Sequence, residues 1–168
     1  TNTEEVEVTD RMIEGLLLTM IHEGPRVIAD PDNYQARANI MWAGMMAHNN
    51  SCGVGRTQDW TSHNIEHELS ALYDCAHGAG LAVVMPAVFT YTLEHNVMRF
   101  AQAAVRVWGC QMDFADPKRT ALEGIEALRN FLISIGMPKN FAELGAKEED
   151  IEKLAHTCCY GDVNTGTV

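Results

Sequence analysis

Apolar residues recur at helical spacing along almost the whole chain. In the first such segment, Met12, Leu16, Leu17, Met20 and Ile21 fall three or four positions apart, which places them on one face of a helix. No alternation of apolar and polar residues typical of a strand extends beyond a few positions. The pattern predicts an all-α fold, a helical bundle of about six to seven helices forming a single domain over residues 1–168.

Capping and helix-breaking residues predict the boundaries of the first two helices. The first is expected to begin with Thr9 or Asp10 as its N-cap. It is expected to end at "HEGP", because glycine and proline interrupt helical hydrogen bonding. The second is expected to begin after "ADPDN", with Asp30 or Asp32 as its cap, and to be followed by the glycine-containing loop "NNSCGVGRTQD".

Four or five further helices are expected in the rest of the chain. One begins near Thr61 or Ser62 and runs through "HNIEHELSALYD", and "LAVVMPAVFTYTLEH" is expected to form a buried helix bent by Pro86. "NVMRFAQAAVRVWG" continues in helical register and stops at Gly109. A long amphipathic helix follows, capped by Asp116 with proline at its first position, and "KEEDIEKLAHTCC" forms a last amphipathic helix.

Composition and charge exclude several classes of partner. Hydrophobic residues make up 46% of the chain and charged residues 21%, as in ordinary globular proteins. A formal net charge of −11 argues against binding to nucleic acid or to an anionic membrane surface. The longest apolar runs are too short to span a bilayer, and the acidic start "TNTEEVEV" lacks the basic region of a signal peptide. We therefore expect a cytoplasmic protein with neither a membrane nor a nucleic acid as partner.

The cysteines agree with a reducing compartment. Their number is odd and no C-x-x-C pair occurs, which predicts reduced thiols. They are Cys52, Cys75, Cys110, Cys158 and Cys159.

The segment "HNIEH" has the spacing of a metal site. It reads H-x-x-E-H, the motif of inverted zinc metalloproteases, in which His63 and His67 would bind the metal and Glu66 would act as general base. That interpretation needs a third ligand, for which Glu94 and Glu123 are candidates. The simpler alternative is that both histidines lie on the solvated face of an ordinary helix. A further alternative is a non-enzymatic helical interaction domain.

A third interpretation pairs His63 with His77, fourteen positions later. On one straight helix these residues would lie about 21 Å apart, too far for one metal ion. They can meet only if the helix ends between them and the chain folds back. Gly78 and Gly80 offer such an end, although they could equally mark a plain helix stop.

The same segment carries a family resemblance. "DWTSHNIEHELSALYDCAHGAGLAVVMPA" resembles the second motif region of the iron-containing (group III) alcohol dehydrogenases. "EGLLLTMIHEGPRVIADPDNYQARANIMWAGMMAHN", "RVWG" and "ALRNFLISIGMP" resemble other helices of the butanol dehydrogenase branch. The resemblance implies the dehydroquinate synthase-like helical C-terminal domain of a two-domain enzyme. An N-terminal domain would bind NAD or NADP, and the enzyme would interconvert primary alcohols and aldehydes, usually as a homodimer or larger assembly.

The resemblance also assigns the histidines. His63 and His77 match metal ligands of the family, and His67 matches a histidine proposed to assist proton transfer. The metal would be Fe²⁺ or Zn²⁺, since imidazole and carboxylate ligands suit both ions. The family's Asp-x-x-x-His ligand pair would precede "TDRMIEGLLL", and no such pair stands there; the glycine-rich nucleotide motif does not occur in this sequence. We therefore expect residues 1–168 to form the metal-binding C-terminal part of a longer enzyme, inactive and only weakly metal-binding by itself.

Overall fold

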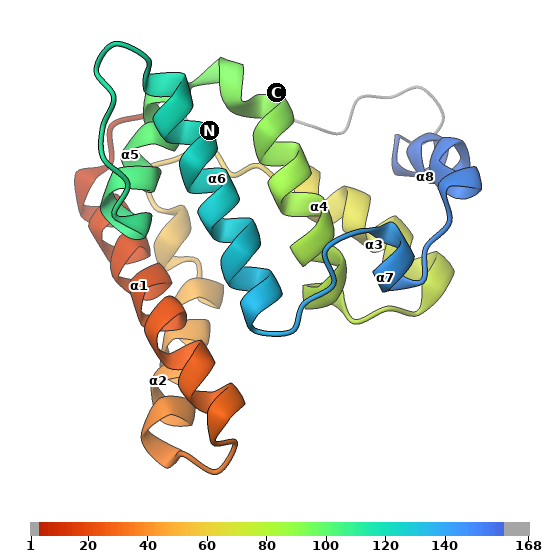
Figure 1. The fold of residues 1–168 in the computed structure, drawn as a ribbon, viewed down its shortest axis with the longest axis horizontal. Helices are drawn as coiled ribbons and strands as arrows, with labels where there is room; N and C mark the ends of the chain where they lie inside the picture. The colour runs from red at the N-terminus through yellow and green to blue at the C-terminus, as the bar shows by residue number, and fades with distance from the viewer. Residues whose placement is uncertain (1–3, 160–168) are drawn as a thin grey trace.

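The computed structural model describes residues 4–159, and within that range it contains helices and no strand (Figure 1). This confirms the all-α prediction, with eight α-helices rather than six or seven when a four-residue helix is included. The elements are α1 (Glu7–Ala29), α2 (Tyr34–His48), η1 (Ser51–Gly53), α3 (Thr61–Tyr73), α4 (His77–Thr92), η2 (Leu93–His95), α5 (Val97–Trp108), α6 (Pro117–Ser134), α7 (Phe141–Leu144), η3 (Glu148–Asp150) and α8 (Ile151–Cys158), where η denotes a 3₁₀ helix.

Three pairs of neighbouring helices, α1–α2, α3–α4 and α5–α6, make up most of the fold, and a small group of short helices lies at the C-terminal end (Figure 1). Helices α1 and α2 run side by side and project from the rest, while α3 and α4 lie next to each other on the opposite side of α6 (Figure 1). The core between α3, α4 and the C-terminal segment contains Leu69, Val84 and Ala146. A second core joins η2, α5 and α6 through Leu93, Ala101 and Ala121. Larger, partly buried side chains such as Tyr73, Phe141 and Phe100 pack around these two cores.

The closest helix pair is α5 and α6. A Cβ atom added at Gly124 of α6 would lie 2.8 Å from the Cα atom of Ala104 on α5. Because that neighbour is backbone, a side chain at position 124 would force the two helices apart. Gly124 is thus a packing residue of the core.

Helix α1 is longer than its sequence predicts. It continues through Gly24 and Pro25 to Ala29, so the predicted end at "HEGP" is wrong. A proline removes only one backbone N–H from the helix. The ion pair between Glu23 and Arg26, at 2.8 Å, spans the same turn. The cap of α2 is Asn33, whose side chain accepts a hydrogen bond from the N–H of Ala36, rather than one of the two aspartates expected there.

Asp10 is a buried ion-pair residue. Helix α1 begins at Glu7, so Asp10 lies inside its first turn and is not the cap. Its carboxylate accepts hydrogen bonds from Arg56 Nη2 at 2.6 Å and Arg99 Nη1 at 2.5 Å. Burial acts to raise the pKa of Asp10, but the hydrogen bonds from the two arginines outweigh it and hold the pKa below its ordinary value of 3.8. This cluster fixes α1 and α5 to the loop that follows η1.

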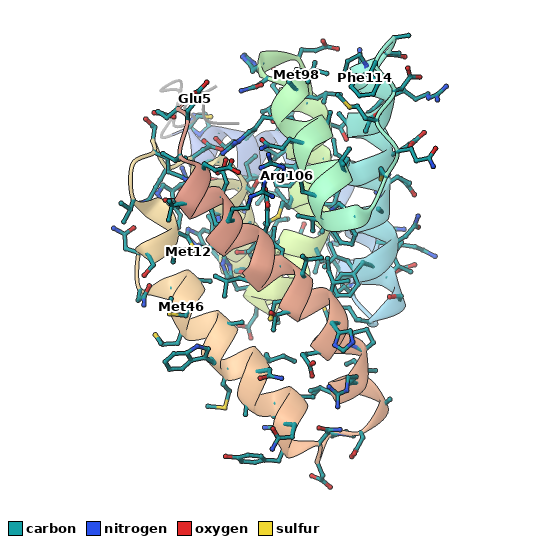
Figure 2. The ribbon with its side chains drawn as sticks, turned by 90° about the vertical axis from the view of Figure 1, so that its left-hand side faces the viewer. Glu5, Met12, Met46, Met98, Arg106 and Phe114 are labelled. Atoms are coloured by element: carbon teal, nitrogen blue, oxygen red, sulfur yellow. The ribbon has the colours of Figure 1, made fainter. Side chains whose placement is uncertain are left out.

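A second polar link joins the same two helices nearer the solvent. Arg106 of α5 points toward α1 (Figure 2) and lies 3.0 Å from Glu14 and 3.4 Å from Glu7. The two links together orient α5 against the α1–α2 hairpin.

Several local predictions are confirmed. Asp116 caps α6 by accepting from the Arg119 N–H, Pro117 occupies the first position, and α5 ends at Gly109 with φ +71°. Cys52, Cys75, Cys110 and Cys159 are free thiols. Among residues 4–159, none of the helices is both long enough and apolar enough to span a bilayer.

Candidate metal centre

A short reversal of the chain between α3 and α4 creates the candidate site. Helix α3 ends at Tyr73, and Asp74 takes the left-handed conformation with φ +52° while its N–H bonds to the Ser70 carbonyl. Aspartate tolerates this conformation better than most residues. Helix α4 then begins at His77. The sequence left such a reversal open as one possibility, but Gly78 and Gly80 do not form it, because both glycines lie inside α4.

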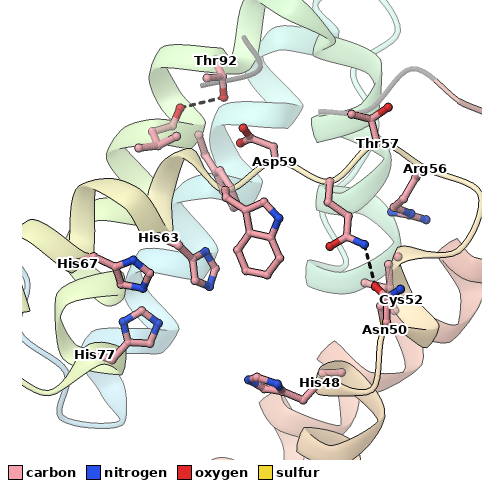
Figure 3. A pocket seen from close by; sticks show the side chains of 17 residues that line it. His48, Asn50, Cys52, Arg56, Thr57, Asp59, His63, His67, His77 and Thr92 are labelled. Carbon is pink, nitrogen blue, oxygen red and sulfur yellow. Dashed lines mark hydrogen bonds between the residues drawn. The ribbon is translucent and has the colours of Figure 1, made fainter. Parts of the chain in front are cut away.

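The reversal brings three imidazole rings together (Figure 3). The ring centroids of His63 and His77 lie 5.4 Å apart, those of His67 and His77 5.3 Å, and those of His63 and His67 6.4 Å. The predicted pair of His63 and His77 is therefore adjacent in space. These distances alone would allow either histidine of α3 to share an ion with His77.

The peptidase interpretation of "HNIEH" does not fit this geometry. Glu66 is fully buried, with no exposed surface, whereas a general base must face a reactive water. One oxygen of its carboxylate contacts Nδ1 of His77, and the other accepts a hydrogen bond from the Ser70 hydroxyl. Sequence reasoning missed this contact to His77. The spacing of Glu66 and Ser70, one helical turn apart, was the only local indication that the carboxylate points into the protein.

The electrostatics of the centre favour neutral imidazole at His63. Burial lowers the pKa of His63, and the positive charges that His77 and His67 can carry lower it further. The edge of the Trp60 ring packs on His63, with centroids 5.0 Å apart. A neutral imidazole is the form that binds a metal ion.

The donor set fits a divalent transition metal. Within the described part of the chain, three potential ligand atoms lie within 4.8 Å of one another, one each from Glu66, His67 and His77. His63 stands beside this group with its ring next to that of His77. Imidazole nitrogens with a nearby carboxylate suit Fe²⁺ and Zn²⁺.

The three histidines line one side of a cleft of about 860 Å³. His48 of α2 lies across the opening from them (Figure 3). A cleft of this size accommodates a small-molecule ligand. Sequence reasoning did not single out His48. The wall between the two sides is formed by Asn50 before η1, by the loop after η1 and by α4; the residues of the loop and of α4 include Arg56, Thr57, Asp59, Val88, Phe89 and Thr92.

The chain and its fold match a known family. Residues 1–167 match the model of the Fe-containing alcohol dehydrogenase family, C-terminal. The chain therefore belongs to the Fe-containing alcohol dehydrogenase family, which confirms the resemblance found in its sequence.

The relatives include enzymes named for both alcohol and aldehyde chemistry. The chain is 39% identical over 146 residues to probable NADH-dependent butanol dehydrogenase 1 of Bacillus subtilis, covering 87% of this chain and 38% of that protein. It is 36% identical over 154 residues to NADPH-dependent aldehyde reductase YqhD of Escherichia coli, covering 92% and 39%.

A solved structure shows the same fold. The crystal structure of NADH-dependent butanol dehydrogenase A from Thermotoga maritima superposes with a TM-score of 0.88 at 38% identity, over 93% of this chain and 39% of that one. The chain thus spans about two fifths of the length of these relatives.

Proposed function

We propose that this chain is the metal-binding part of an NAD(P)-dependent alcohol dehydrogenase that interconverts primary alcohols and aldehydes. The observation that carries the proposal is the convergence of three imidazoles on one wall of a small-molecule cleft in a member of this family. His63 and His77 hold the divalent metal, which is Fe²⁺ or Zn²⁺. Neutral His63 suits that role because burial disfavours its protonated form.

The chemistry divides between the bound groups and the chain. When bound, the cation supplies Lewis-acid polarisation of the substrate oxygen, and the nicotinamide supplies the hydride chemistry. His67 is the more exposed histidine of α3 and lies against His77, so it can carry a proton between the cleft and water. The ring of Trp60 packs against that of His63, with centroids 5.0 Å apart. The nucleotide site and the remaining metal ligands lie outside these 168 residues in the proposed enzyme.

Metal titration of single-histidine variants tests the ligand assignment. Zn²⁺ binding by the 168-residue chain, measured by calorimetry, is expected to be weaker than about micromolar, because two neutral imidazoles form an incomplete coordination sphere. His63→Ala and His77→Ala should abolish it, whereas His67→Ala and the control His48→Ala should leave it. Binding tighter than micromolar that is lost with His67→Ala and kept with His77→Ala would refute the assignment.

A turnover assay tests whether catalysis requires the cofactor site that we place on another part of the enzyme. The chain mixed with NADH or NADPH, butyraldehyde and Zn²⁺ or Fe²⁺ is expected to consume no reduced nucleotide, because the proposed cofactor site is on another part of the enzyme. Steady consumption above a protein-free control would contradict this part of the proposal.

A further inference from the structure

Glu66 is an unusual residue to bury completely. It has no exposed surface, and no lysine or arginine of the described residues forms an ion pair with it. Burying a carboxylate is costly unless hydrogen bonds compensate it. Its two oxygens are met by Nδ1 of His77 and by the hydroxyl of Ser70. The carboxylate thus contacts the ring of one histidine, His77.

The surroundings of Glu66 are shaped to hold it there. The Ser70 hydroxyl also lies 3.2 Å from the carbonyl oxygen of Cys75, inside the reversal that leads to His77. Gly80 is buried beside the carboxylate, and a Cβ atom there would lie 2.6 Å from Cγ of Glu66. Three separate features, namely the serine, the reversal and the glycine, therefore accommodate this one side chain.

The contact determines which nitrogen of His77 is available. When the carboxylate of Glu66 is ionised it can only accept hydrogen bonds, and Nδ1 of His77 is then the atom that carries the shared proton. The neutral ring then has its lone pair on Nε2, the one nitrogen left to bind a metal ion. Metal-binding histidines commonly donate their other N–H to a carboxylate, which orients the ring and increases its basicity.

We propose that Glu66 is the positioning residue of His77: it holds the ring in the Nδ1–H tautomer with Nε2 directed to the metal. The part of this inference that concerns metal affinity rests on the proposed function. The tautomer and ring orientation are properties of the metal-free chain.

NMR of the histidine rings tests the inference without metal. In long-range ¹H–¹⁵N spectra of the 168-residue chain, His77 is expected to show a protonated Nδ1 and an unprotonated Nε2. Glu66→Gln should shift this ring toward a mixture of tautomers, because an amide can donate to Nδ1 as well as accept from it. The control Glu68→Gln makes the same change on the same helix, and the spectrum of His77 should stay as in the wild type. An Nε2–H tautomer in the wild-type chain would overturn the inference, and so would a His77 ring that is unmoved by Glu66→Gln.

A Zn²⁺ titration followed by the same ring signals separates this inference from the proposed function. Glu66→Gln is expected to weaken binding by about 10- to 100-fold, as for other partners of metal-bound histidines, and Glu68→Gln to leave it unchanged. Unchanged affinity with Glu66→Gln would overturn the positioning role. Complete loss, equal to that with His77→Ala, would identify Glu66 as a ligand and overturn it too. If the wild-type chain binds no Zn²⁺, the proposed metal site fails while the tautomer measurement still decides the role of Glu66.

Discussion

Two glycines in the first turns of α4 provide a matched pair for testing the packing of the centre. Gly78 is exposed, and a Cβ atom built there meets nothing within 4 Å. Gly80 is buried, and the same atom would lie 2.6 Å from Cγ and 2.9 Å from Cδ of Glu66. Both residues have helical backbone, so alanine is allowed at either position. The two substitutions differ in what the added methyl group meets.

The expected magnitudes follow from that difference. Replacing glycine by alanine in a helix contributes up to about 1 kcal/mol of stability, so Gly78→Ala should be neutral or stabilising. Gly80→Ala should gain the same stabilisation of the helix, but the overpacked methyl group should cost about 1–3 kcal/mol. Glu66 cannot move away cheaply, because it is fully buried and would lose its hydrogen bonds to His77 and Ser70. Gly80→Ala should therefore be less stable than Gly78→Ala by about 1–3 kcal/mol.

Thermal and urea unfolding followed by circular dichroism measure this difference. For a chain of 168 residues, 1 kcal/mol corresponds to a change in Tm of about 2–4 °C, so the midpoint for Gly80→Ala should fall clearly below that for Gly78→Ala. Equal midpoints would show that Glu66 is not held rigidly against α4 and would refute the reasoning. The reasoning would also be refuted if Gly80→Ala were stable and the NMR signals of its His77 ring matched those of the wild type.

Other parts of the bundle give further predictions. Asp10→Asn should lower the free energy of unfolding by about 3 kcal/mol near neutral pH, because two arginines lose a largely buried carboxylate. Since the pKa of Asp10 is lowered from 3.8, this contribution is present above pH 3.8 and is lost as the pH falls through the folded-state pKa. Urea unfolding across that range checks it, and a difference from wild type that stays constant with pH would contradict it. Gly124→Ala should destabilise by about 1–3 kcal/mol through its clash with Ala104, whereas Gly15→Ala, at an open helical position, should not; thermal unfolding compares them. Tyr73→Phe removes the hydroxyl that donates a hydrogen bond to Asp150 at 2.5 Å, and should lower the free energy of unfolding by about 1 kcal/mol. It should also speed amide hydrogen exchange in α8, and unchanged exchange there would contradict the prediction.

The sequence predicted best those features that depend on neighbouring residues. The helix Thr61–Tyr73, the cap at Asp116 and the stop at Gly109 each follow from side chains within one turn of the boundary. The continuation of α1 through Pro25 was not predicted. Proline removes one backbone hydrogen bond, and the other interactions of the helix outweigh that loss. Asp10 was assigned as a cap because its partners, one of them 89 positions away, are invisible in local sequence.

In the candidate site, too, the features set by contacts between separate segments could not be predicted from local sequence. Spacing left three uses for the histidines open, and only the family resemblance selected His63 with His77. The proximity of their rings depends on the left-handed turn at Asp74, which spacing rules did not identify. Glu66 was considered as a base because the motif contains a glutamate. Its actual direction is set by Gly80, which leaves room for it on the neighbouring helix.

The short reversal at Asp74 also has a consequence for how the protein folds. The contact between Glu66 and His77 joins residues only 11 positions apart, whereas the link from Arg99 to Asp10 joins residues 89 positions apart. Closing a short loop costs less chain entropy than closing a long one, and local contacts form faster. The histidine hairpin of α3 and α4 can therefore assemble early in folding, before α1 and α5 are brought together, and insertions in distant loops should leave its geometry largely intact.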